Sequence, residues 1–216
     1  NELKEQIAQT AKPSAPEKHL VADLLAPNDT VVLVVPIDSA APKGRLILPQ
    51  QQTIRSLLDA GCIPVVTRET ELARTLSLLR EPPALVVTDS QAFGMVSRIV
   101  PDSVRLTSFS ILFARYKGDL RTAVLGAAAL RRLKDGDTVL ISEGCTHHRQ
   151  CGDIGTEKLP RWVRQYTGRD IRFVFTSGGE FPENLSPYAL IIHCGACMLG
   201  EREMQSRLRR AAEQCI

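Results

Sequence analysis

The chain has 216 residues, of which 44% are apolar and 24% charged, so it can bury the core of one large or two small globular domains. Its 27 basic and 24 acidic residues are mixed along the sequence, and the net charge of +3 therefore does not indicate a nucleic acid or an anionic membrane as partner. No apolar run is long enough to span a membrane and the charged start does not resemble a signal peptide, so we expect a cytoplasmic protein.

The first half of the chain alternates short apolar segments with helical segments. Residues 1–16 are interpreted as an N-terminal linker or helix remnant. The β-branched run at 30–37 predicts a strand that is covered on both faces of a parallel sheet. Further strands are expected at 63–67, 84–88 and 104–108, with helices at 50–60, 70–79 and 90–99. This series of β-α units predicts a first domain over 17–110, and the pattern weakens at 110–118, where we place the change of domain.

The second half begins with a predicted helix rich in Ala and Leu at 119–133. Strands are expected at 138–142, 171–176 and 189–193, and helices at 159–166 and 201–214. The fold class is therefore two consecutive α/β domains with mainly parallel sheets flanked by helices, the second domain covering 111–216. Trp162 and Tyr166 are expected in the core, the arginines within 203–210 at a solvated helix end, and the Gly pair at 178–179 in a turn.

Two segments of the second domain contain three of the six cysteines and three of the four histidines. They read Glu-Gly-Cys-Thr-His-His at 143–148 and His-Cys-Gly-Ala-Cys at 193–197. Each lies where a predicted strand ends, and the carboxyl ends of parallel strands meet at one edge of a sheet. The two segments are therefore expected to form one site.

The residue types in these segments predict a metal site. Cys194 and Cys197 form a Cys-x-x-Cys pair that can hold one metal or one cluster, and Cys145 supplies a third thiolate. Zinc bound by three cysteines and a histidine would be a closed structural site in an interaction module. A 4Fe-4S cluster on three cysteines would keep one iron open, as a carrier needs, whereas a redox enzyme would use the cluster for electron transfer. Spacing alone leaves these alternatives open.

At this point the sequence resembles a known family. Cys145-Thr-His147 followed about 45 residues later by His193-Cys194-x-x-Cys197 is similar to the signature of the FeFe-hydrogenase maturation GTPases, usually called HydF. The segments at 145–155, 159–162 and 34–51 also look like that family. Its members begin with a GTPase domain, but this sequence contains no Gly-x-x-x-x-Gly-Lys-Ser/Thr loop, so GTP hydrolysis is not assigned to it and we expect no enzyme activity. The chain resembles the portion that follows the GTPase domain.

The resemblance implies a scaffold or chaperone for metal clusters. Cys145, Cys194 and Cys197 would bind a 4Fe-4S cluster whose exchangeable fourth ligand is one of Glu143, His147 and His193. A di-iron subcluster precursor, supplied by radical-SAM maturases, would be held beside this cluster and passed to an apo FeFe-hydrogenase. The first domain would form a homodimer by pairing its sheet with that of a second copy.

The remaining cysteines and one histidine are given smaller roles. Cys151 and His148 lie close to the proposed ligands, and either could be a spare ligand or have no role in binding. Cys62 is expected to be an ordinary small apolar residue, and Cys215 to lie at the frayed end of the chain.

Overall fold

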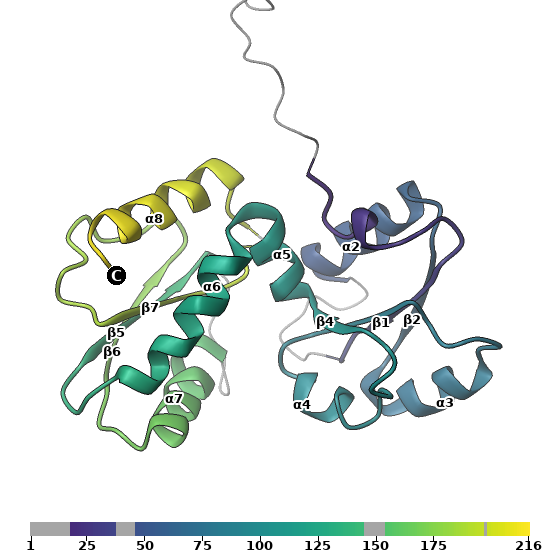
Figure 1. Ribbon diagram of the computed structural model, residues 1–216, viewed down its shortest axis with the longest axis horizontal. Helices are drawn as coiled ribbons and strands as arrows, with labels where there is room; N and C mark the ends of the chain where they lie inside the picture. Colours follow the sequence, from purple (N-terminus) through teal and green to yellow (C-terminus); the bar gives the residue numbers. More distant parts are fainter. Residues whose placement is uncertain (1–17, 38–45, 145–153, 197) are drawn as a thin grey trace, which may run out of the picture.

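The protein folds into two α/β domains, each built on a parallel sheet with helices on both faces (Figure 1). The computed structural model describes residues 18–37, 46–144, 154–196 and 198–216. The predicted fold class is confirmed within these residues. The N-terminal segment predicted at 1–16 lies outside them.

The first sheet has four parallel strands in the order β2-β1-β3-β4. The strands are β1 (Thr30–Val34), β2 (Ile63–Thr67), β3 (Leu85–Thr88) and β4 (Leu106–Ser108). The helices of this domain are α2 (Leu48–Asp59), α3 (Leu72–Leu78), α4 (Phe93–Val96) and α5 (Phe109–Lys117), with short 3-10 turns η1 (Ala22–Leu24) and η2 (Glu69–Glu71). Within the described residues β2 and β4 are the edge strands, so the backbone groups on their outer sides have no partner strand.

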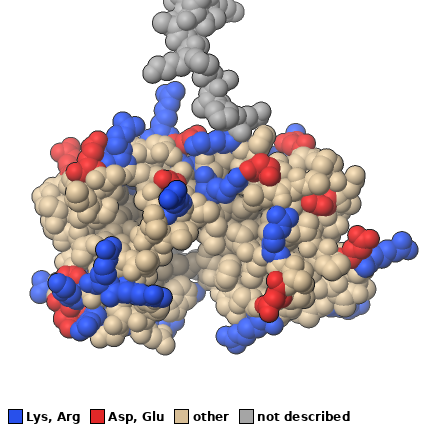
Figure 2. Space-filling model, viewed as in Figure 1, with Lys and Arg blue, Asp and Glu red and all other residues tan. Residues whose placement is uncertain are grey.

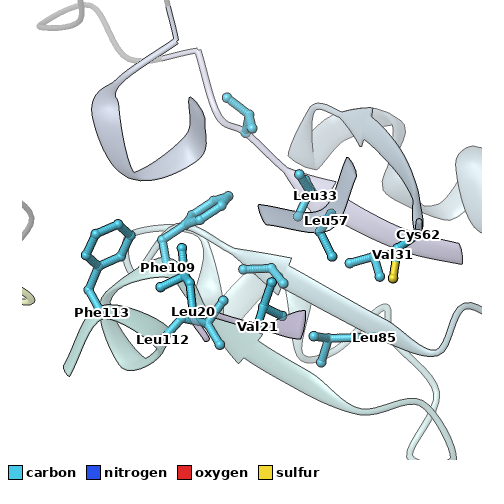
Figure 3. Close-up of a cluster of buried hydrophobic side chains, with 12 residues drawn as sticks. Leu20, Val21, Val31, Leu33, Leu57, Cys62, Leu85, Phe109, Leu112 and Phe113 are labelled. Atoms are coloured by element: carbon cyan, nitrogen blue, oxygen red, sulfur yellow. The ribbon is translucent and has the colours of Figure 1, made fainter. Parts of the chain in front are cut away.

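Alternation along β1 explains why this sheet is covered on both faces. Val31 and Leu33 point into an apolar cluster with α2 and α5, which Figure 3 shows around Leu57 and Phe113. Val32 and Val34 point to the opposite face. There they join a second cluster made by α3 and α4. A strand whose successive side chains are all buried needs apolar residues throughout, as the run at 30–37 predicts.

The second sheet has three parallel strands in the order β6-β5-β7. They are β5 (Thr138–Glu143), β6 (Arg172–Ser177) and β7 (Leu190–His193). The helical elements are α6 (Leu120–Ala127), the 3-10 turn η3 (Ala128–Arg132), the π-helical turn η4 (Ile154–Lys158), α7 (Leu159–Thr167) and α8 (Glu201–Glu213). Figure 1 shows α7 and α8 on opposite faces of the sheet. The helix predicted at 119–133 is present as α6 continued by η3.

Residues 110–117, where the sequence pattern weakens and the change of domain is placed, are helical. They belong to α5, which starts directly after β4 with the Ser108 hydroxyl accepting a hydrogen bond from the amide of Ile111 at 3.2 Å. Phe109, Leu112 and Phe113 of α5 are buried in the first core. The helix therefore packs on the first domain, and its periodicity was obscured because it is short.

Two further sequence expectations are corrected, and two are confirmed. Trp162 and Tyr166 are 41% and 60% exposed, because α7 turns Pro160 and Val163 toward the core instead. Arg207 is only 1% exposed, so the arginines of α8 are not all solvated. The turn expected at the Gly pair is present, with Gly178 in the left-handed region at φ +60°. Cys62 is buried and Cys215 exposed, as expected.

No helix in the described part of the chain is long and apolar enough to cross a membrane.

Candidate metal centre

Cys194 lies where the two segments of the predicted site come together. Its amide donates to the carbonyl of Ser142 at 3.0 Å, which extends the pairing of β7 with β5 one residue beyond the strand. Its Sγ accepts hydrogen bonds from the amides of Gly144 at 2.9 Å and Ala196 at 3.4 Å. Gly144 directly precedes Cys145 in the sequence, so the start of the first segment contacts the Cys194 sulfur.

Several predicted ligands lie outside the described residues: Cys145, His147, His148, Cys151 and Cys197. Within the described residues no group of three or more metal-binding side chains is found. The described part of the site therefore consists of Cys194, Glu143 and His193. Helix α8 begins at Glu201, the residue at which the sequence predicted this helix to start.

Glu143 and His193 extend from opposite faces of the second sheet. Ser142 is paired with His193, and paired residues of parallel strands share a face. Since side chains alternate along a strand, Glu143 and Cys194 lie on the other face. Consistent with this, Glu143 is 8% exposed and its carboxylate lies against Gly155 of η4, where an added Cβ would overlap it. Glycine at position 155 therefore makes room for this carboxylate.

On the opposite face a buried guanidinium organises a polar network. Nε of Arg207 donates to Glu203 Oε1 at 2.8 Å, and its Nη2 donates to the carbonyl oxygen of Gly178 at 2.7 Å. Its Nη1 lies 3.2 Å from Ser142 Oγ and 3.0 Å from His193 Nε2. Buried charges of this kind require several partners, and Arg207 has them from β5, β7, α8 and the turn after β6.

Both ring nitrogens of His193 are engaged. A guanidinium only donates, so His193 Nε2 accepts from Arg207 and the proton resides on Nδ1, which donates to the Cys194 carbonyl at 2.8 Å. Burial lowers the pKa of His193 below its usual 6.5, and the charge of Arg207 lowers it further. His193 is therefore a neutral imidazole that connects Arg207 to the backbone of Cys194.

The loop after Cys194 is held by the first domain. Nζ of Lys117, at the end of α5, donates to the carbonyl oxygens of Ala196 at 3.0 Å and Leu199 at 2.8 Å. A Cβ added to Gly195 would lie 3.0 Å from Cα of Ser110, so this backbone approaches α5 closely and glycine is favoured there. Ala196 has φ +54°, a left-handed conformation that is uncommon for a residue with a Cβ.

The carboxyl ends of strands from both sheets face this site. Gln91, which follows β3, accepts a hydrogen bond from Nζ of Lys158 in η4 at 2.8 Å. Ser110, which follows β4, accepts one from Ser90 at 2.9 Å and lies against Gly195. The site expected at one edge of the second sheet is thus placed between the two domains, where α/β proteins commonly bind ligands.

The donor set around Cys194 suits an anionic metal cluster. A sulfur that accepts two backbone amides is characteristic of cysteines that hold iron-sulfur clusters, because the amides stabilise negative charge on sulfur. Sequence reasoning did not identify Arg207 and Lys117 as parts of the site. Arg207 had no distinguishing signal among the arginines of 203–210, and Lys117 lies in the segment whose helix was not predicted.

Comparison with protein families gives two adjoining matches. Residues 20–118 match the model of the hydrogen maturase F dimerization domain, and residues 121–216 match that of the hydrogen maturase F tetramerization domain. The chain belongs to the hydrogen maturase F family. No curated protein matches it closely enough to count as a relative.

The two hydrogen maturase F domains meet between α5 and α6, because the first match ends at residue 118 and the second begins at 121. The first match contains the four-stranded sheet and α5, and the second contains the three-stranded sheet with Cys194. Both matched models describe domains for self-association, and neither describes a nucleotide-binding domain. The chain therefore has a role in hydrogenase maturation, and its two domains are domains of self-association.

Proposed function

We propose that this chain is a non-catalytic scaffold in FeFe-hydrogenase maturation. Cys145, Cys194 and Cys197 bind a 4Fe-4S cluster, and the chain holds a di-iron subcluster precursor beside it. Radical-SAM maturases supply this precursor in the cytoplasm, and the chain transfers it to apo FeFe-hydrogenase. The observation that carries the proposal is the Cys194 sulfur, which accepts the amide of Gly144 and so joins the two cysteine segments. When bound, the cluster would supply one iron whose coordination position is exchangeable.

Glu143 is the best supported of the three candidates for the exchangeable ligand. It shares a sheet face with Cys194 and follows the residue that pairs with His193. A carboxylate binds iron more weakly than a thiolate, which suits a ligand that must be replaced. His193 has Arg207 on one ring nitrogen and the Cys194 carbonyl on the other, so it fits a supporting role. His147 lies outside the described residues.

The edge strand β2 is suited to the predicted homodimer. Its outer backbone groups have no partner strand in the described residues, and Ile63 and Val66 are about half exposed. A second copy could add its own β2 there and continue the sheet, as exposed edges permit. The dimerization model matched to this domain is consistent with such pairing.

Anaerobic reconstitution with iron and sulfide tests the scaffold. We expect about four iron and four sulfide ions per chain and the electron paramagnetic resonance spectrum of a reduced 4Fe-4S cluster. Replacement of Cys194 by Ser should reduce the iron content strongly. A colourless protein that retains one tightly bound zinc would contradict the proposal and favour a zinc-stabilised interaction module.

The exchangeable position is tested by comparing two conservative variants. Glu143→Gln removes the carboxylate but keeps the size of the side chain, so it should change the spectrum and the response to added imidazole. His193→Gln should leave the response to imidazole as in the unaltered chain and change the spectrum less than Glu143→Gln does, because His193 contacts only the backbone of Cys194. The reverse result would assign the exchangeable position to His193. An unaltered cluster that does not respond to imidazole would favour simple electron transfer.

A further inference from the structure

Arg207 differs from most cations of this chain because it is withdrawn from solvent. The lysine and arginine side chains in Figure 2 extend from the surface, whereas Arg207 is only 1% exposed. Its Cζ lies 5.0 Å from the centre of the Phe181 ring, in the loop after β6 that also provides the Gly178 carbonyl. Whole networks of buried charges can often be replaced by apolar side chains without loss of stability. A buried guanidinium at this place therefore needs a reason other than stability.

The contact between Arg207 and His193 fixes the position of the imidazole proton. Nη1 of Arg207 lies 3.0 Å from Nε2 of His193, and a guanidinium has no acceptor, so Nε2 must accept. The proton is then on Nδ1, which donates to the carbonyl oxygen of Cys194 at 2.8 Å. In the other tautomer an N–H would face the guanidinium and a lone pair would face the carbonyl oxygen. One tautomer therefore satisfies both contacts, and the other satisfies neither.

The carbonyl that His193 binds belongs to the backbone that orients the Cys194 sulfur. The Cys194 amide donates to the carbonyl of Ser142 at 3.0 Å, so His193 holds one side of this residue and β5 holds the other. Sγ is thereby placed where it accepts from the amides of Gly144 and Ala196. A ligand already held in its binding orientation loses less conformational freedom when a metal binds. The metal-free chain is therefore expected to present Cys194 ready for binding.

We propose that Arg207 is a positioning residue for the metal centre, which orients Cys194 by fixing the tautomer of His193. The inference rests on the proposed binding of a cluster by Cys194. Arg207 provides no ligand itself, because a guanidinium has no lone pair to offer a metal. Side chains that orient metal ligands typically alter metal affinity by about 10- to 100-fold when they are replaced. The cluster should therefore be lost faster when the contact between Arg207 and His193 is broken.

Nitrogen NMR of the metal-free full chain with isotope-labelled histidines tests the first step. The sequence has four histidines, and His193→Phe identifies the His193 signals by their loss. Nδ1 should carry the proton in the unaltered chain, whereas both tautomers should be present in Arg207→Met because nothing then donates to Nε2. Arg210→Met is the matched control. Arg210 lies on the same helix and also contacts the Phe181 ring, at 5.0 Å, so this variant should keep the single tautomer.

Iron loss to a chelator from the reconstituted full chain tests the second step. Arg207→Met and His193→Phe should both release iron about 10-fold faster than the unaltered chain, because the Cys194 carbonyl lacks its fixed donor. His193→Asn should release iron nearly as slowly as the unaltered chain, since its amide can donate from about the position of Nδ1. Both His193 variants deprive Arg207 of Nε2, so a merely structural role would give them equal rates. Circular dichroism checks that each variant is folded.

The outcomes separate this assignment from the scaffold. A single Nδ1 tautomer in Arg207→Met, or equal rates for the two His193 variants, would overturn the assignment even where the unaltered chain binds iron. An unaltered chain that takes up no iron would contradict the scaffold and this assignment with it. The His193 variants keep the other contacts of Arg207, so their rates are decisive even where Arg207→Met does not fold.

Discussion

The two sheets of this protein use their buried faces differently. Both faces of the first sheet are filled by apolar side chains, with Val31 and Leu33 on one side and Val32 and Val34 on the other. The second sheet has an apolar cluster under α7, but its other face carries Ser142, Thr176, His193 and the buried Arg207 near the carboxyl ends of the strands.

This difference bears on the proposed metal centre. An apolar core stabilises a domain without constraining single side chains to one orientation. A polar network holds its members in defined geometry but is costly when one partner is lost. The second domain has its network directly behind Cys194, through His193 Nδ1 and the Cys194 carbonyl. The stability of this domain and the geometry of the proposed metal centre are therefore expected to depend on the same residues.

Removal of Arg207 should have the largest effect. Arg207→Met should lower the free energy of unfolding by about 4 kcal/mol, because Glu203, Gly178, Ser142 and His193 lose a buried charged partner. Urea unfolding measures the loss. Arg209→Met is the control, since Arg209 is exposed on the same helix and should change stability by less than about 0.5 kcal/mol. Equal effects of the two substitutions would contradict the role of the network.

A cavity in the core of the first domain should lower stability by a comparable amount but leave iron binding at the proposed metal centre unchanged. Leu33→Ala should lower the free energy of unfolding by about 3 kcal/mol, because Leu33 of β1 is fully buried in the apolar cluster with α2 and α5. The iron content of the folded protein should stay unchanged after reconstitution. Loss of iron in this variant would show that the two domains are not separable in the way their cores suggest.

Lys117 should couple the domains more weakly. Lys117→Met removes the donor to the carbonyls of Ala196 and Leu199 and should cost about 2 kcal/mol. Hydrogen exchange should show greater opening of the loop at 194–200, and iron should be released faster from reconstituted protein. Lys134→Met, an exposed lysine of the second domain, is the control. Unchanged hydrogen exchange of this loop in Lys117→Met would show that Lys117 does not hold it.

The sequence predicted the sheets better than the site. Strands such as 63–67 were predicted with their observed bounds, because a short apolar run between turn residues has few alternative structures. The convergence of Gly144 and Cys194 also followed from the strand ends. Arg207 could not be distinguished from its neighbours, since burial of one arginine depends on partners that come from β5, β7 and the turn after β6.

Exposed apolar residues were missed for a related reason. Trp162 and Tyr166 have the composition and spacing of a buried helix face, and the sequence of one chain does not indicate whether the covering surface belongs to that chain or to another. The same holds for Val124 and Leu125. Such residues become informative only when the structure of the single chain leaves them exposed.

The smallest expected effect concerns pH. In metal-free protein the folded chain keeps His193 neutral below pH 6.5, because burial and the neighbouring Arg207 lower its pKa, with Glu203 opposing them. The unfolded chain takes up a proton near pH 6.5, so stability falls as the pH drops from there toward the lower folded pKa, and is unaffected by this group at higher pH. His193→Gln cannot titrate. The stability difference between the unaltered chain and this variant should therefore narrow between pH 7 and pH 5 in urea unfolding, and a constant difference would contradict a neutral His193 held by Arg207.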